Sequence, residues 1–189
     1  YLAKINSVQN ADQLVALLAE MEPEMGLGFF GSYIGADAKN SNKNVIYVGT
    51  GSLGLPDRDY YVSDAPDNKE KREKYLTHIA RMLKFIGESE DVANVNAKKI
   101  LALETKMSTA TLDRVQRRDR RNTYNPMSFA DLQKLAPTVK WDAYFQTVGM
   151  GKVDSLVVSQ PKYLQTVETI LKDNQVEDWK THMRWTALR

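Results

Sequence analysis

Few side chains in this sequence could bind a metal ion. It holds two histidines, His78 and His182, and no cysteine. Neither histidine belongs to an HExxH pattern, which places two imidazoles on one helix face where they can bind zinc. Each lies beside an apolar stripe of helical spacing, in LTHIAR and KTHMRW, which is typical of a structural histidine. We therefore expect no metal site and no cofactor in this chain.

Covalent and acid-base catalysis lack their usual residues as well. The sequence has no cysteine nucleophile and no G-x-S-x-G elbow. The glycine-rich GTGSLG at residues 49–54 is not followed by the Lys-Ser/Thr of a phosphate-binding loop, so we interpret it as a turn. Acidic neighbours such as Asp57 and Asp59 do not meet a glycosidase's need for two carboxylates across a cleft. We assign no catalytic residue.

The charge pattern gives little reason to expect a polyanionic or lipid partner. Arg114–Arg121 contains five arginines, but the net charge of the chain is only +2 and few aromatic residues accompany the run. No apolar run approaches the roughly 20 residues of a membrane span. We expect no nucleic-acid partner and no membrane contact by this segment. The alternative, nucleic-acid binding through the arginine run, predicts salt-dependent retention on a polyanion.

Apolar residues at helical spacing predict the elements that position these side chains. A polar tip between two runs rich in aromatic and β-branched residues predicts a β-hairpin near residues 29–49, with its turn near Asn40–Lys43. SLVVS at residues 155–159 predicts a short extended piece. The fold class is therefore mainly α, an irregular multi-helix array with one β-hairpin. The predicted helices are 10–21 (ended by Pro23 and Gly26), 68–86, 91–112 (with Val95 facing inward), one from Ser128 to before Pro137, one around Trp141 that stops at Gly149, one from Pro161 and one from Val176.

Several separated stretches carry a resemblance to a known family. The octet GLPDRDYY at residues 54–61, and the hairpin sequence that leads into it, resemble the N-terminal region of the neprilysin-type zinc metallopeptidases. ILALETKMSTATL, RRDRRNTYNPMSFADLQKLAPTVKWDAYF, VVSQPKYL and VEDWKTHMRW resemble the later pattern of that region. The resemblance covers nearly the whole chain and is closest to the bacterial, oligopeptidase O-like branch.

This resemblance implies a function for the chain as part of something larger. In the family, a C-terminal domain holds zinc through HExxH and a further glutamate, and a helical domain covers it to enclose a peptide-sized chamber. Residues 1–189 are then expected to be part of the helical covering domain, with the catalytic zinc domain absent and the chain alone inactive. Its partners are then the catalytic domain of the same polypeptide and peptide substrates. The alternative is a stand-alone helical protein-interaction domain without peptidase activity.

Two further expectations follow from the resemblance. The arginine with which such enzymes hold a substrate carboxylate maps onto no residue here, so the substrate-binding residues are unknown. The family's bacterial members suggest the cell envelope or periplasm, with the cytoplasm as the alternative.

The octet itself has a physical interpretation. Its proline and acidic residues are typical of a turn that leads into a capped helix. We expect a structural cluster of Asp57, Arg58, Asp59, Tyr60 and Tyr61, with Arg58 held between Asp59 and backbone carbonyls and the tyrosines in the core. Replacing Arg58 by alanine would then cost a few kcal/mol, as breaking a buried ion network does.

Overall fold

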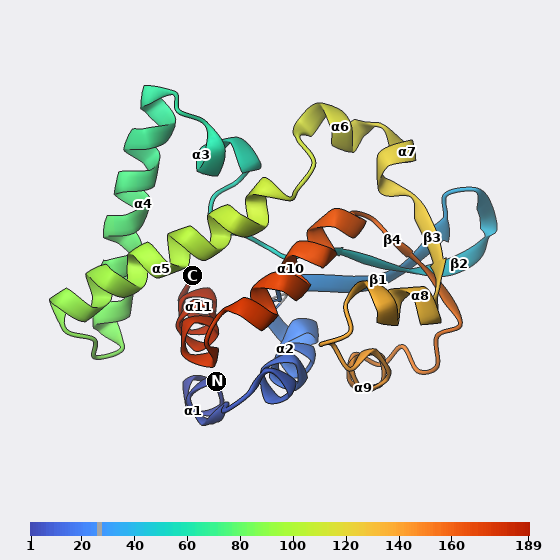
Figure 1. The fold of residues 1–189 in the computed structure, drawn as a ribbon, viewed down its shortest axis with the longest axis horizontal. Coiled ribbons are helices and arrows are strands. Elements are labelled where there is room, and N and C mark those ends of the chain that lie inside the picture. Colours follow the sequence, from blue (N-terminus) through green and yellow to red (C-terminus); the bar gives the residue numbers. More distant parts are fainter. Residues whose placement is uncertain (26–27) are drawn as a thin grey trace. The chain divides into compact units, whose positions relative to one another are not determined.

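The computed structural model describes residues 1–25 and 28–189. Within these ranges it has eleven helices and a four-stranded sheet, which confirms the mainly α fold with a hairpin (Figure 1). No helix in these ranges has the length and apolar character needed to cross a bilayer. The helices are α1 (Leu2–Ser7), α2 (Ala11–Met25), α3 (Arg58–Val62), α4 (Pro66–Phe85), α5 (Glu90–Thr109), α6 (Arg114–Arg118), α7 (Arg120–Thr123), α8 (Phe129–Leu135), α9 (Trp141–Thr147), α10 (Pro161–Asp173) and α11 (Val176–Leu188). The strands are β1 (Phe30–Asp37), β2 (Asn40–Thr50), β3 (Asn125–Ser128) and β4 (Ser155–Val158).

The chain divides into two compact units, each assembled from segments that are distant in sequence. Unit 1 comprises Tyr1–Gln9, Leu53–Ala110 and Asn174–Arg189. Unit 2 comprises Asn10–Ser52 and Thr111–Asp173. The octet belongs to unit 1 and the hairpin to unit 2.

Unit 1 is a helical unit built on the two long helices α4 and α5. Helices α3 and α11 pack against both of them, and α1 packs against α11 (Figure 1). Its core contains Ile79 and Leu83 from α4, Ile100 from α5 and Trp185 from α11. Burying each aliphatic side chain of this size stabilises the fold by about 1.5–3 kcal/mol, so this apolar core is a major contribution to the stability of the unit.

Helix α5 presents one buried stripe to unit 1. Its members recur every three or four residues, as one face of a helix requires, and include Ala93, Ala97, Ile100, Glu104 and Met107. The prediction that Val95 faces inward is wrong, since this side chain is 56% exposed. It lies two residues from the stripe, about 200° around the helix. The buried stripe includes a carboxylate, Glu104, which must be paired.

Unit 2 contains the sheet, whose strand order is β1-β2-β4-β3. Strands β1 and β2 form the antiparallel hairpin, β2 pairs with β4 in parallel, and β4 pairs with β3 antiparallel. The predicted extended piece at 155–159 is therefore confirmed as β4. Strand β3, directly before the predicted helix start at Ser128, was not predicted, because its four residues NPMS contain a proline and no alternating pattern.

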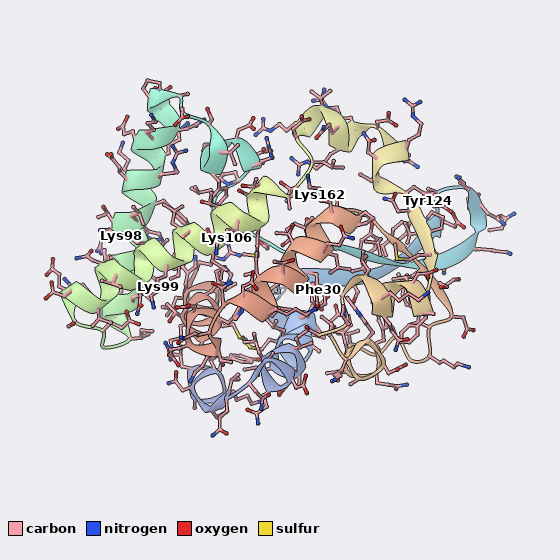
Figure 2. The ribbon with its side chains drawn as sticks, viewed as in Figure 1. Phe30, Lys98, Lys99, Lys106, Tyr124 and Lys162 are labelled. Carbon is pink, nitrogen blue, oxygen red and sulfur yellow. The ribbon has the colours of Figure 1, made fainter. Side chains whose placement is uncertain are left out.

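An aromatic cluster joins the start of β1 to helix α9 in unit 2. The ring centroids of Phe30 and Trp141 are 5.1 Å apart, and those of Tyr144 and Phe145 are 5.3 Å apart. Such tilted or edge-on ring pairs stabilise a core beyond the area they bury. Phe30 is labelled in Figure 2.

The hairpin turn lies two residues earlier than predicted. It consists of Ala38 and Lys39, and β2 already begins at Asn40. The register pairs Ala36 with Asn44 but Asp37 with Asn40, so residues 41–43 are extra residues in β2. The polar stretch interpreted as a turn is therefore an irregularity next to the turn.

The first predicted helix, residues 10–21, corresponds to α2 and continues to Met25 through Pro23. A proline lacks the amide hydrogen of one helical bond, and near the end of a helix the loss is limited to the last turn. The prediction that Pro23 ends the helix is therefore wrong, and Gly26 lies outside the described residues.

Other helix ends follow local chemistry as predicted. The Ser128 hydroxyl accepts a hydrogen bond from the Asp131 amide at 3.1 Å and so caps α8. Gly87 and Gly149 follow α4 and α9 with φ of 96° and 80°, where residues with a side chain are strained.

Candidate functional site

The octet forms helix α3 and its N-terminal cap. The Asp57 carboxylate accepts a hydrogen bond from the Asp59 amide at 3.4 Å, and Asp57 is buried. Arg58 Nη1 lies 3.8 Å from Asp59 Oδ1, with the two side chains 30% and 61% exposed. The Lys71 ammonium group lies over the ring of Tyr60, 4.9 Å from the ring centroid. Four of the five predicted cluster residues therefore act near the surface or in the cap.

Tyr61 is different, because it belongs to the buried core of unit 1. Its hydroxyl accepts a hydrogen bond from the Leu55 amide at 2.7 Å and donates one to Glu104 Oε2 at 2.8 Å. The last residue of the octet thus holds the beginning of the octet and connects it to α5. Neither Leu55 nor Glu104 belongs to the predicted cluster.

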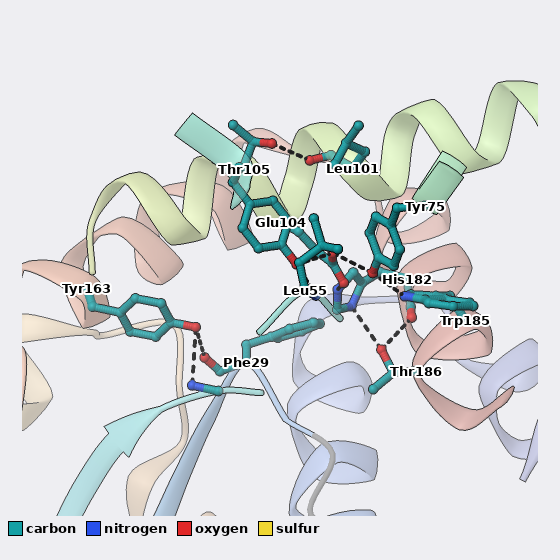
Figure 3. Close-up of polar contacts among 12 residues, drawn as sticks. Phe29, Leu55, Tyr75, Leu101, Glu104, Thr105, Tyr163, His182, Trp185 and Thr186 are labelled. Carbon is teal, nitrogen blue, oxygen red and sulfur yellow. Dashed lines mark hydrogen bonds and ion pairs between the residues drawn. The ribbon is translucent and has the colours of Figure 1, made fainter. Parts of the chain in front are cut away.

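Glu104 is the centre of a buried polar group in unit 1. The residue has no exposed surface. Its Oε2 also accepts from the Tyr75 hydroxyl at 2.8 Å, and its Oε1 lies 3.5 Å from His182 Nε2 (Figure 3). The Trp185 indole donates to the Tyr75 oxygen at 3.1 Å. Side chains from α3, α4 and α11 therefore converge on one carboxylate of α5.

A second residue of α11, Thr186, contacts His182 on the side away from Glu104. The Thr186 hydroxyl donates to the His182 carbonyl oxygen at 2.7 Å and lies 3.4 Å from His182 Nδ1. Both residues are buried. One ring nitrogen thus faces Thr186 and the other faces Glu104.

The electrostatics of this group favour an ionised carboxylate with neutral tyrosines. Burial raises the pKa of Glu104, but its contacts with His182, Tyr75 and Tyr61 outweigh burial and hold that pKa below its ordinary value. Burial, reinforced by the charge of Glu104, raises the pKa of Tyr61 and Tyr75 well above the ordinary range. Because every member is buried, the group has the character of a structural anchor and not of a solvent-accessible catalytic site.

The described residues do not fit a zinc site. In residues 1–25 and 28–189, no three His, Cys, Asp or Glu side chains are grouped so that they could bind a metal ion. His78 instead meets the ring of Trp185 edge-on, with centroids 5.6 Å apart. His182 faces a single carboxylate, that of Glu104.

The glycine-rich stretch at 49–54 is occupied by contacts within the chain. In unit 2, the Gly51 amide donates to the Tyr163 hydroxyl at 3.2 Å, and that hydroxyl donates to the Phe29 carbonyl oxygen at 2.6 Å. In unit 1, a Cβ added to Gly54 would lie 1.7 Å from the Tyr75 hydroxyl oxygen. Gly54 thus allows the close approach of Tyr75, whereas Gly51 allows the close approach of the Phe29 backbone.

The arginine run forms the two short helices α6 and α7. Asp113 caps the first in a capping box with Gln116, and Asp119 caps the second. Arg121 pairs with Asp119 at 2.7 Å. Part of this charge is therefore neutralised within the run.

A cavity of about 470 Å³ lies beside β1 in unit 2, where the sequence indicated no site. On its wall, the Glu22 carboxylate accepts a hydrogen bond from the backbone amide of Ser32 at 2.6 Å and another from the hydroxyl of Tyr144. The Ser32 and Tyr144 hydroxyl oxygens are 2.9 Å apart. Glu22 lies on helix α2 and belongs to no recognisable sequence motif. Its hydrogen bonds to β1 and α9 are therefore visible only in the folded structure.

Comparisons with known proteins agree with one another. The model for the N-terminal region of peptidase family M13 matches residues 1–189. Endothelin-converting enzyme 1 of Rattus norvegicus is 34% identical over 166 residues, which are 85% of this chain and 22% of that enzyme. Neprilysin-3 of Drosophila melanogaster is 31% identical over 171 residues, with the same two shares. The chain thus spans about a fifth of the length of these curated relatives.

A solved structure shows the same fold. Zinc metalloprotease Zmp1 of Mycobacterium tuberculosis, in its open state, matches with a TM-score of 0.91 at 34% identity. The match covers 98% of this chain and 29% of that one. With the family model matching every residue and the predicted neprilysin-type resemblance confirmed, the chain belongs to peptidase family M13.

Proposed function

We propose that this chain is a non-catalytic, mostly helical segment of a zinc-dependent endopeptidase, in which it helps to enclose the chamber where peptides are cut. The supporting observation is the match to Zmp1, which extends over nearly all of this chain but less than a third of that metalloprotease. The family membership and the curated relatives point the same way. On this proposal, residues 1–189 are part of the covering domain.

The division of labour follows from the side chains. The described residues offer no zinc site, so the zinc ligands and the groups that hydrolyse the peptide bond are proposed to lie in a catalytic domain of the same polypeptide. This chain is proposed to form part of the chamber surface and to be rigid where buried side-chain hydrogen bonds join its helices. The anchor around Glu104 is one such element, since it holds four helices of unit 1 at one point.

We propose the bacterial cell envelope or periplasm as the location, with the cytoplasm as the alternative. Zmp1 supports a bacterial origin, although the curated relatives are animal proteins. Fractionation of the source cells, followed by immunodetection of this chain, distinguishes the compartments.

The central test compares the product of the complete gene with the 189-residue chain. Zinc content and cleavage of a short internally quenched peptide are measured for both. The proposal expects that only the longer product holds zinc and cuts the peptide, and that it spares the same peptide sequence inside a folded protein. Peptide cleavage by the 189-residue chain alone would overturn the non-catalytic assignment. A gene that ends near Arg189, with no zinc in its product, would favour the stand-alone interaction domain.

A further inference from the structure

The cavity beside β1 in unit 2 contains a single charged group. Its volume of about 470 Å³ lies within the roughly 300–1,000 Å³ that is typical of ligand pockets. Among the described residues that line it, only Glu22 carries a charge. We propose that this cavity binds the side chain of an arginine in a peptide, with the guanidinium group on Glu22. That the ligand is a peptide rests on the proposed function, whereas its positive charge follows from the cavity itself.

Glu22 is held in place by donors that carry no charge. Its Oε1 accepts a hydrogen bond from the Ser32 amide at 2.6 Å, and its Oε2 accepts one from the Tyr144 hydroxyl. The Ser32 hydroxyl lies 3.5 Å from the same Oε1. Burial, reinforced by the charge of Glu22, raises the pKa of Tyr144, so this hydroxyl keeps the proton that it donates. These contacts fix the orientation of the carboxylate without adding a positive charge beside it.

The position of Glu22 at the end of α2 adds to the negative potential of the cavity. The last turn of a helix carries partial negative charge from its carbonyl groups, and α2 has no basic residue there. This potential favours a cation and opposes an anion. A metal ion would need several ligands, and in residues 1–25 and 28–189 no three His, Cys, Asp or Glu side chains are grouped to provide them. The charge therefore selects an organic cation.

Two glycines form a floor without side chains beneath the carboxylate. Gly31 on β1 and Gly49 on β2 are register partners, so they lie side by side in the sheet. A Cβ added to Gly31 would lie 3.5 Å from Glu22 Oε1, which places the carboxylate on the face where that side chain would be. Glycine inside a strand often marks the close approach of a ligand. A planar guanidinium group can therefore lie flat on this floor beside Glu22.

The other walls suit the stem of an arginine side chain. They include Pro23, Tyr33, Val148 and Met150, and a basic side chain combines an apolar stem with a charged head. Tyr33 is 57% exposed and shares the face of Gly31, so its ring is available to a cation. A guanidinium group is favoured over an ammonium group, because it stacks on rings and donates two parallel hydrogen bonds to a carboxylate. Each oxygen of the Glu22 carboxylate can accept more than one hydrogen bond.

The test measures binding by ligand-observed NMR titration, which suits weak ligands, with the 189-residue chain and with the product of the complete gene. The probe is N-acetyl-arginine amide, compared with N-acetyl-citrulline amide, which has nearly the same shape and no charge. We expect the arginine probe to bind about fivefold or more tightly than the citrulline probe, and Glu22→Gln to remove this difference. Glu20→Gln is the matched control, because it removes the same charge from an exposed residue of α2 outside the described lining.

A second variant fills the floor and leaves Glu22 unchanged. Within 4 Å, a Cβ added to Gly49 would meet Ser159 Oγ at 3.6 Å and the Gly31 carbonyl oxygen at 4.0 Å, which are ordinary contacts. Valine also favours a strand. Gly49→Val is therefore expected to fold, with circular dichroism like that of the unaltered chain, and to weaken binding of both probes about fivefold or more because its side chain occupies the floor.

The outcomes separate this proposal from its alternatives. Equal binding of the two probes, equal effects of Glu22→Gln and Glu20→Gln, or unchanged binding to a folded Gly49→Val variant would each overturn it. If the product of the complete gene binds the arginine probe with the same dependence on Glu22, the cavity is open to a peptide. If only the 189-residue chain binds the probe, the rest of the polypeptide fills the cavity and the peptide assignment is wrong. None of these measurements depends on zinc or peptide cleavage, so the proposed function stands or fails separately.

Discussion

Replacing Tyr61 by phenylalanine isolates the anchor in unit 1. The substitution keeps the buried ring and removes one hydroxyl, which joins the Leu55 amide to Glu104 at 2.7 and 2.8 Å. The neighbouring Tyr60 is the matched control. Its ring contacts Lys71, and within the described residues its hydroxyl makes no hydrogen bond.

The magnitude follows from the two bonds that are lost. A hydrogen bond to an ionised carboxylate is worth about 1.5–3 kcal/mol, and an amide left without its acceptor costs about 1 kcal/mol more. Tyr61→Phe is therefore expected to lower the free energy of unfolding by roughly 2–4 kcal/mol, and Tyr60→Phe by less than about 0.5 kcal/mol. With a urea dependence of about 2 kcal/mol per molar, the midpoint for Tyr61→Phe falls by roughly 1–2 M.

The assay is urea unfolding of the chain, followed by far-ultraviolet circular dichroism and by tryptophan fluorescence. Fluorescence is informative because Trp185 contacts Tyr75 in the same buried group. If the two variants lose the same stability, or if Tyr61→Phe unfolds at the midpoint of the unaltered chain, the anchor contributes nothing and the argument is refuted.

Three further predictions concern unit 1. The folded-state pKa of Glu104 lies below its ordinary value of 4.5. The stability that its carboxylate contributes is therefore present above pH 4.5 and is lost as the pH falls through the folded-state pKa. When urea midpoints are measured at decreasing pH, stability should fall less steeply for Glu104→Gln than for the unaltered chain. Gly54→Ala should destabilise by about 2 kcal/mol or more, as overpacking does, because the added Cβ meets Tyr75; calorimetry measures this loss. Arg58→Ala, for which the sequence predicts a few kcal/mol, should cost less than about 1 kcal/mol in urea unfolding, since its ion pair with Asp59 is long, at 3.8 Å, and the Asp59 side chain is 61% exposed.

Local patterns were enough to predict the longer helices, whereas the short helices α1, α6 and α7 were not predicted. Helices such as α4 and α10 carry long apolar stripes at a spacing that only a helix places on one face. The Ser128 cap and the glycine stop at Gly87 act within a few residues, so a short window of sequence contains the whole cause. The turn of the hairpin was misplaced because Ala38 and Lys39 carry no turn signal, whereas the polar residues after them do.

The anchor was only half visible in the sequence. Glu104 is the only charged residue of a buried α5 stripe that is otherwise apolar except for Ser108, and a carboxylate there predicts a buried charge with partners. Its partners could not be named, because Tyr61 lies 43 residues away and no local pattern selects it over Tyr60.

The segments of unit 1 leave the ribosome at widely separated times. The bond between Trp185 and Tyr75 joins residues 110 apart, and at roughly 5–20 residues per second translation separates them by about 5–20 s. Within that interval residues 111–173 of unit 2 are made, and during their synthesis Glu104 has its tyrosines but neither His182 nor Trp185. Until α11 is made, the Glu104 carboxylate therefore lacks two of the side chains that enclose it in the folded unit, and α11 is the last segment needed to complete the core of unit 1.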